Sequence, residues 1–165
     1  ELLVSAHRRR HRNDRVNRDL PRPPTGDPKP APPRGTSTPV GSSFYVSPDR
    51  AQAGPWAFTG EQVEDCVRRH WPHAAVSRAF ENFLEIDAEI EPGRRAELSF
   101  NLRHGAFSFE DREPHSGPLT VIHTVLHTLA PEVPVVRWID YDADLRPLDP
   151  AGGLEAFIDD FPARP

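Results

Sequence analysis

The chain has 165 residues and a net charge of −5, and it contains no apolar run long enough to span a membrane. Its charge is divided unevenly, because residues 1–54 contain ten Lys or Arg against five Asp or Glu, whereas residues 55–165 contain ten against twenty. The length predicts one domain, and the two parts of the chain need separate interpretations.

The cysteine content and the first residues bear on the compartment. Cys66 is the only cysteine, so an intramolecular disulfide and a thiolate cluster are both excluded. The apolar run Leu2–Val4 is too short for the core of a signal peptide, and charged residues follow it. The strong excess of Arg over Lys is typical of a bacterium with a GC-rich genome. We therefore expect a cytoplasmic bacterial protein that does not associate with membranes.

Residues 1–54 are predicted to form a disordered basic tail. Arginine dominates residues 7–22, and prolines recur at close spacing from Pro21 to Pro39, so too few apolar residues are present for a core. The basic run could bind nucleic acid or another anionic surface. We favour a solvated tail, because no aromatic side chains interleave the arginines as stacking platforms for bases.

The folded part, residues 55–165, begins with a helix signal. Thr59 and Gln62 have the spacing of a capping box, and Phe58 can pack on Val63 as a hydrophobic staple. A helix is expected from Gly60 to about His70. Pro72 then ends it, because proline cannot continue the helical hydrogen bonds.

Two alternating segments follow and predict a β-hairpin. Apolar residues alternate with polar ones over residues 84–90 and again over residues 96–102, with a turn at Pro92–Gly93 between them. Placing Ile90 opposite Ala96 pairs the remaining apolar residues two by two: Ala88 with Leu98, Ile86 with Phe100, and Leu84 with Leu102. The same register places Glu89 directly opposite Glu97.

A third strand is predicted after a two-residue loop at His104–Gly105. That loop would pair Leu102 with Phe107 and Phe100 with Phe109, which gives a three-stranded meander. One face of the meander is apolar and needs cover. The other face carries five acidic residues against Arg103 alone: Glu85, Asp87, Glu89, Glu97 and Glu110.

The segments after the meander are expected to cover its apolar face. Pro118 is expected at the first position of an amphipathic helix that ends before Pro131, and residues 133–141 are expected to form a further strand. A last helix is expected after Asp149–Pro150, with Asp149 as its cap. The predicted order is α-β-β-β-α-β-α, which indicates a two-layer α+β domain with helices packed on one face of an antiparallel sheet.

Two histidines provide the best metal-like feature. His123 and His127 are four residues apart on the covering helix, a separation that lets two imidazoles reach one metal ion. Thr124 occupies the position where the HExxH pattern has its general-base Glu, so zinc-peptidase chemistry is not indicated. Both histidines also fall at the edge of the apolar stripe, where polar flanking residues are ordinary. We favour that structural interpretation over a metal site.

The acidic residues Asp140, Asp142 and Asp144 have the spacing that begins a calcium-binding EF-hand loop. The rest of the pattern fails, because Leu145 stands where Gly is needed and Ala151 where the bidentate Glu is needed. A strand that ends in a solvated turn explains the same residues. No Gly-rich phosphate loop, GxSxG elbow, paired-cysteine metal motif or dinucleotide fingerprint occurs in the chain.

The main functional hypothesis is a small acidic protein-binding module, of the kind found in bacterial immunity proteins and antitoxins, that engages a basic protein partner through its polar sheet face. The residues expected to bind are Glu85, Asp87, Glu89, Glu97, Asp140, Asp142 and Asp144. No cofactor is expected. An acidic surface that only keeps the protein in solution explains the same charges.

The alternative hypothesis is a small metal-dependent or hydrolytic enzyme. It would use His123, His127 and the loop Asp140–Asp144, and it requires these groups to converge in one pocket. The lack of a recognised catalytic motif favours the binding module over the enzyme. A third possibility is nucleic-acid binding through residues 7–22 alone, which would be independent of sequence and strongly dependent on salt.

Overall fold

The computed structural model describes residues 41–161, which form ten helices and strands in chain order. These are β1 (Ser43–Pro48), α1 (Gly60–His70), β2 (Ala75–Phe80), β3 (Phe83–Glu91), β4 (Arg94–Asn101), β5 (Ala106–Glu110), α2 (Ser116–Leu129), β6 (Val135–Ile139), β7 (Asp142–Leu148) and α3 (Leu154–Asp159).

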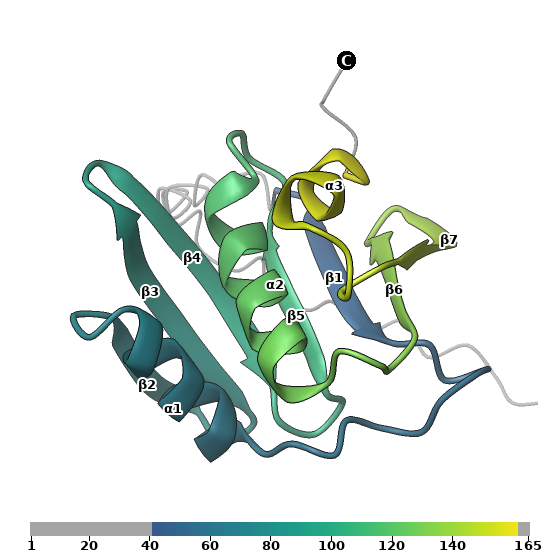
Figure 1. The fold of residues 1–165 in the computed structure, drawn as a ribbon, viewed down its shortest axis with the longest axis horizontal. Helices are drawn as coiled ribbons and strands as arrows, with labels where there is room; N and C mark the ends of the chain where they lie inside the picture. The colour runs from purple at the N-terminus through teal and green to yellow at the C-terminus, as the bar shows by residue number, and fades with distance from the viewer. Residues whose placement is uncertain (1–40, 162–165) are drawn as a thin grey trace, which may run out of the picture. The chain divides into compact units, whose positions relative to one another are not determined.

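All seven strands belong to one antiparallel sheet, in the order β2-β3-β4-β5-β1-β6-β7. The three helices lie together on one face of this sheet, with α2 across its centre (Figure 1). The predicted α+β class and the layering of helices on one sheet face are therefore confirmed.

Three strands were not predicted. β2 and β7 form the two edges of the sheet, and β1 lies inside it between β5 and β6. Because β1 occupies Ser43–Pro48, the predicted domain boundary after residue 54 is wrong, and the folded part begins earlier. A strand of six residues among prolines gives almost no local signal, since its partners lie far along the sequence. Residues 1–40, including the basic run, lie outside the described residues.

The predicted register of the β3–β4 hairpin is wrong by two residues. Ala88 lies opposite Ala96, and Glu89 lies opposite Arg95 instead of Glu97. The chain turns tightly at Pro92–Gly93, where Gly93 has φ +79°, and an irregularity between Glu89 and Glu91 absorbs one residue. The loop is thus shorter than the predicted pairing required, and every partner moves toward the turn.

The β4–β5 register is also displaced by two residues, so that Phe100 lies opposite Phe107 and Ser99 opposite Ser108. The cause is the side chain of Asn101, whose Oδ1 accepts the backbone N–H groups of Arg103 and His104. This local turn draws the chain out of the strand before the expected two-residue loop. Even so, all apolar side chains stay on the helix side, because a shift of two preserves the face.

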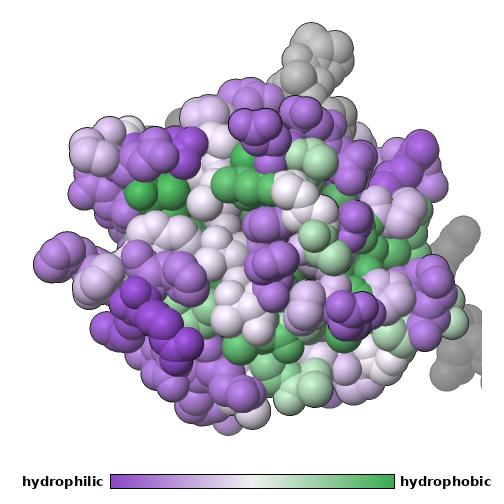
Figure 2. All heavy atoms as spheres, viewed as in Figure 1, coloured by the Kyte–Doolittle hydropathy of each residue, from purple (hydrophilic) through white to green (hydrophobic). Residues whose placement is uncertain are grey.

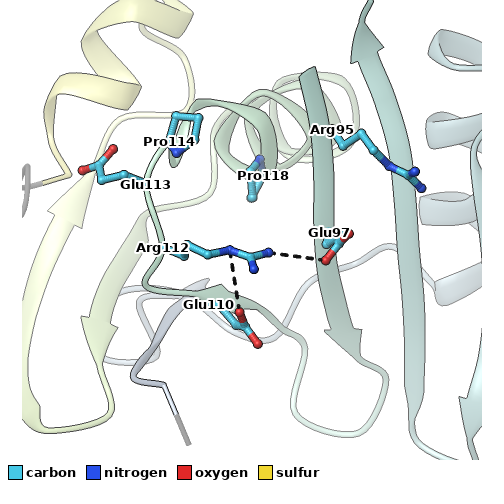
Figure 3. A pocket seen from close by; sticks show the side chains of 7 residues that line it. All are labelled: Arg95, Glu97, Glu110, Arg112, Glu113, Pro114 and Pro118. Atoms are coloured by element: carbon cyan, nitrogen blue, oxygen red, sulfur yellow. Dashed lines mark ion pairs between the residues drawn. The ribbon is translucent and has the colours of Figure 1, made fainter. Parts of the chain in front are cut away.

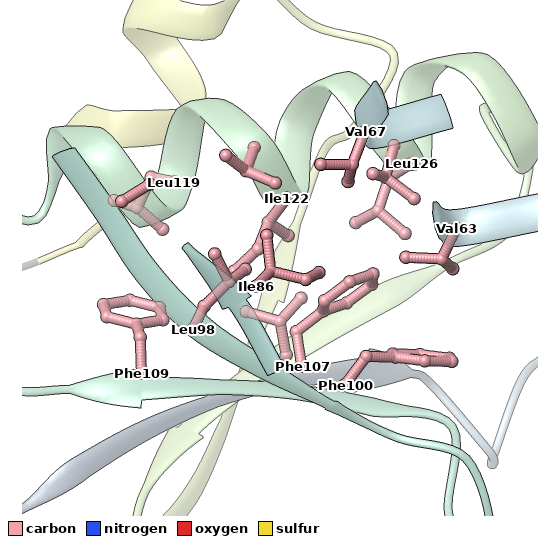
Figure 4. Packing of buried hydrophobic residues seen from close by; sticks show 14 of the residues in the cluster. Val63, Val67, Ile86, Leu98, Phe100, Phe107, Phe109, Leu119, Ile122 and Leu126 are labelled. Carbon is pink, nitrogen blue, oxygen red and sulfur yellow. The ribbon is translucent and has the colours of Figure 1, made fainter. Parts of the chain in front are cut away.

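The hydrophobic core lies between the sheet and helices α1 and α2 (Figure 4). The labelled residues from the helices are Val63, Val67, Leu119, Ile122 and Leu126, and those from the sheet are Ile86, Leu98, Phe100, Phe107 and Phe109. Phe100 contacts Phe107 with 4.7 Å between ring centroids. Phe100 is buried in this core, although its strand partners differ from those expected.

The helix ends match the sequence to different degrees. The capping box of α1 is present, with Thr59 accepting from the N–H of Gln62 and the Gln62 side chain accepting from the N–H of Thr59. Helix α2 begins at Ser116, so Pro118 lies within its first turn and not at its first position. Helix α3 begins after Gly153, because Asp149 forms a separate turn by accepting the N–H of Ala151. In the described part of the chain, no helix is long and apolar enough to cross a membrane.

Candidate binding face

The face of the sheet opposite the helices carries most of the predicted binding residues. Within residues 41–161, α1, α2 and α3 all lie on the other side (Figure 1). The helix side is a patchwork of apolar and polar residues, with strongly hydrophilic residues gathered over α1 (Figure 2).

We call the opposite side the open face, and it consists of an acidic half and an aromatic half. The acidic half is formed by Glu85, Asp87, Glu89, Glu97 and Glu110, with Arg95 and Arg112. The aromatic half is formed by Tyr45, Phe83 and Trp138, with Ser47, Asn101, Ala106 and Ser108.

Ion pairs on the acidic half differ from the expectation that Arg103 alone would oppose the acids. Arg103 lies in the β4–β5 turn, whereas Arg95 projects from β4 beside Asp87. Arg95 Nε donates to Asp87 Oδ1 at 3.1 Å, and its Nη2 donates to Oδ2. This hydrogen bonding by Asp87, with the charge of the same carboxylate, raises the pKa of Arg95.

Arg112 is the second cation on the acidic half. Its guanidinium lies between Glu97 on β4 and Glu110 at the end of β5 (Figure 3). The two N–O separations are 3.7 Å and 4.0 Å, and all three side chains are well exposed, so these pairs are weak. Five carboxylates and two guanidinium groups therefore leave the acidic half with negative charge.

Glu85 and Glu89 form no ion pair among the described residues. Glu89 Oε1 accepts the backbone N–H of Gly93 at 3.1 Å, which supports the turn after β3. Glu85 is half-buried and lines a pocket of about 260 Å³ together with Glu97 and Glu110. Three carboxylates thus border one recess in the middle of the sheet, which is suited to a cationic group.

Sequence reasoning missed the aromatic half, because Tyr45 lies in the strand assigned to the tail. Tyr45 and Trp138 lie opposite each other on β1 and β6, and their rings stack at 5.3 Å between centroids with 10° between planes. They border a pocket of about 490 Å³ that Phe83 closes on the other side. Its remaining lining residues are Ser47, Arg50, Asn101, His104, Ala106 and Ser108. This volume falls in the range of about 300 to 1,000 Å³ typical of ligand pockets.

The two halves are joined by strand register. One row of directly paired residues crosses five neighbouring strands of the open face: Glu85, Ser99, Ser108, Tyr45 and Trp138. Ser99 and Ser108 share a hydrogen bond of 2.8 Å between their hydroxyls. Ser108 lines both pockets, so the row runs without a break from a carboxylate to an aromatic stack over small side chains. We call this row the transverse row.

The predicted acidic loop lies elsewhere on the sheet, at the β6–β7 hairpin. Asp140 Oδ2 accepts the N–H of Ser43, Asp142 Oδ1 accepts the N–H of Asp144, and Asp144 forms an ion pair of 2.5 Å with Arg146. Each carboxylate therefore has a local partner in or beside the hairpin. Only Asp140 lies in the turn, whereas Asp142 and Asp144 belong to β7, so the interpretation of a strand that ends in a polar turn holds for Asp140 alone.

The two histidines predicted as metal-ligand candidates instead form hydrogen bonds to the backbone of another segment. His123 Nε2 lies 2.9 Å from the carbonyl oxygen of Gly152, and His127 Nδ1 lies 3.2 Å from that of Pro150. Both imidazoles therefore donate to the loop before α3, and their rings stack at 5.6 Å. Among residues 41–161, no group of three or more His, Cys, Asp or Glu side chains is placed to hold a metal ion. The convergence required by the enzyme hypothesis is not found in that part of the chain.

A buried polar cluster at the start of α2 was also missed by sequence reasoning. His115 Nε2 lies 3.1 Å from Asp111 Oδ1, while Ser42 Oγ donates to Asp111 Oδ2 at 3.0 Å. The His115 ring also contacts Phe44 at its edge. Both partners of the His–Asp pair are at most 6% exposed, so the cluster ties β1, β5 and α2 together at one point.

No family model, curated protein or solved structure matches this chain. The candidate function therefore depends on the residues and geometry of the open face.

Proposed function

We propose that the protein is a binding module that captures a basic protein segment on its open face. The observation that carries the proposal is the transverse row, which joins the recess of Glu85, Glu97 and Glu110 to the aromatic pocket on one continuous surface. A nuclease blocked by an immunity protein, or a toxin blocked by an antitoxin, has the basic surface that this chemistry would recognise.

Electrostatics supports the choice of a basic partner. Glu85 forms no ion pair within the described residues, and Arg112 is far enough from Glu97 for solvent to weaken the pair. A cationic side chain in the pocket of Glu85, Glu97 and Glu110 would relieve repulsion among three carboxylates. The gain would appear mainly as faster association, since exposed charges steer encounters.

The experiment uses the full chain and a fluorescent peptide in which arginines are separated by Gly and Ser. Binding is followed by anisotropy at about 50 mM and about 300 mM salt, where exposed charges are screened to different extents. Affinity should fall as salt increases. The double variant Glu85→Gln and Glu97→Gln should bind about fivefold more weakly at the lower salt concentration.

A matched control carries the same change in charge on the helix side. Asp65 on α1 and Glu155 on α3 are both exposed, so the double variant Asp65→Asn and Glu155→Gln should bind the peptide as the wild type does. If the two double variants lose the same affinity, net charge and not the open face attracts the peptide. If no form of the protein binds the arginine peptide, the proposed function is wrong.

A further inference from the structure

The aromatic half indicates which chemical groups the partner carries besides positive charge. Electrostatic attraction alone does not account for a pocket of about 490 Å³ with aromatic side chains on two sides. Phe83 borders this pocket from β3, while Tyr45 and Trp138 border it from β1 and β6, so small floor residues such as Ala106 lie between aromatic walls. Side chains that pack flat against aromatic rings would fill such a groove.

Polar groups around the pocket add a second constraint. Asn101 Oδ1 is used by two backbone N–H groups, so the remaining polar group of that side chain is its Nδ2 donor. The Arg50 guanidinium, which donates to the carbonyl oxygen of His104 at 2.7 Å, lies at the same pocket. Arg50 and Asn101 thus offer donors at the pocket, which favours a ligand that carries acceptors.

The dimensions of the transverse row suit an extended ligand. From Glu85 to Trp138 the row crosses four strand spacings, or about 19 Å at the usual separation of strands. A polyproline II segment rises about 3.1 Å per residue, so about six residues would reach from one end to the other.

We propose that the open face binds an arginine-containing, proline-rich peptide in the polyproline II conformation. This inference rests on the proposed function and names the class of its partner. Proline rings pack on Tyr45 and Trp138, and an arginine enters the pocket of Glu85 and Glu97. Proline has no N–H, so the peptide presents mainly carbonyl acceptors to the donors Arg50 and Asn101.

Single-stranded nucleic acid is the other polymer that stacks on aromatic side chains of a sheet. Its phosphates would have to pass the carboxylates of Glu85, Glu97 and Glu110, and this repulsion favours the peptide. An oligothymidylate is therefore included in the test as the competing ligand.

The experiment measures binding of three probes to the full chain. The first is a twelve-residue peptide of prolines with three arginines, the second replaces each proline by Gly or Ser, and the third is an oligothymidylate of similar length. The proline peptide should bind about tenfold more tightly than the Gly/Ser peptide, because its bound conformation is already favoured and aromatic contacts are added. Trp138→Ala should remove that advantage, and Glu85→Gln should weaken both peptides.

The outcomes separate this inference from the proposed function. Equal affinity for the two peptides would overturn the inference and leave the binding module standing, whereas binding of neither peptide would overturn both. Tighter binding of the oligothymidylate would make the open face a nucleic-acid surface. Because Trp138→Ala could disturb the sheet, Phe83→Ser provides a second test at the opposite wall of the pocket, and thermal melting of both variants verifies folding. Retention of the tenfold advantage in both folded variants would contradict the aromatic contact.

Discussion

Arg95 donates hydrogen bonds to both carboxylate oxygens of Asp87 across the β3–β4 hairpin, on the exposed side of the sheet. This guanidinium offsets one negative charge on the acidic half of the open face. Arg95→Gln should therefore strengthen binding of an arginine-containing peptide and make the affinity more dependent on salt. Thermal unfolding should change little, because exposed ion pairs contribute little to stability. Anisotropy titrations at two salt concentrations measure the effect.

The control for that prediction is Arg69→Gln. Arg69 lies exposed in α1 on the helix side, so the variant has the same net charge without altering the open face. Equal gains in the two variants would show that the peptide responds to the charge of the whole molecule. A gain confined to Arg95→Gln supports a local site.

Much of the fold could be predicted because its signals are local. The capping box of Thr59 and Gln62 marked the start of α1, and period-two alternation marked β3, β4 and β5 with the correct inward face. Register was not predictable in the same way. It depends on a bulge beside Glu89 and on the Asn101 side chain, neither of which changes the hydrophobic pattern.

Only the acidic half of the candidate site could be predicted from the sequence. The acids of β3 and β4 could be placed on one face by alternation alone, but their ionic partners could not, because Arg95 becomes a neighbour of Asp87 only in the observed register. The aromatic half required β1 to enter the sheet. Tyr45 pairs with Trp138, which lies more than ninety positions further along the chain. A pairing over such a long sequence separation produces no pattern in the local sequence that could predict it.

Gly117 lies where α2 comes close to the backbone of β4. A Cβ atom at this position would lie 2.3 Å from the backbone oxygen of Arg95, which cannot move aside as a side chain would. Gly117→Ala should therefore destabilise the protein by about 2 kcal/mol, although alanine ordinarily favours helix. Gly54→Ala is the control, because nothing lies within 4 Å of a Cβ atom there. The free energies of unfolding of both variants are measured by urea unfolding, and equal values would refute the close contact.

Cys66 links stability to alkaline pH. Burial raises the pKa of its thiol, although the nearby Thr128 side chain and the charge of Arg69 act in the opposite direction. The thiol of the unfolded chain ionises near pH 8.5, whereas the folded chain keeps its proton to higher pH. This contribution to stability is therefore complete below about pH 8 and is lost as pH rises toward the folded pKa.

The measurement compares wild type with Cys66→Ala by urea unfolding from about pH 7 to about pH 10. The wild type should lose more stability over this interval than the variant, since other ionisable groups are common to both. In addition, the native thiol should react slowly with a thiol reagent until the protein unfolds. Parallel pH profiles with rapid native labelling would mean that Cys66 is not buried.

The structural role of the histidines on α2 can be separated from metal binding. His123→Ala removes the donor to the carbonyl of Gly152 and should lower the free energy of unfolding by about 1 to 2 kcal/mol. An equimolar amount of Zn²⁺ should leave the melting temperature of the wild type unchanged. A rise in melting temperature with Zn²⁺ that disappears in His123→Ala would instead support a metal site.

The most direct test of the open face maps binding onto individual backbone amides. The full chain, labelled with ¹⁵N, is titrated with the arginine- and proline-containing peptide, and amide shift changes are recorded. We expect the largest changes along the transverse row, from Glu85 through Ser99 and Ser108 to Tyr45 and Trp138, with little change in α1 and α2. Shift changes concentrated on the helices, or none at saturating peptide, would contradict the assignment of the open face as the binding surface.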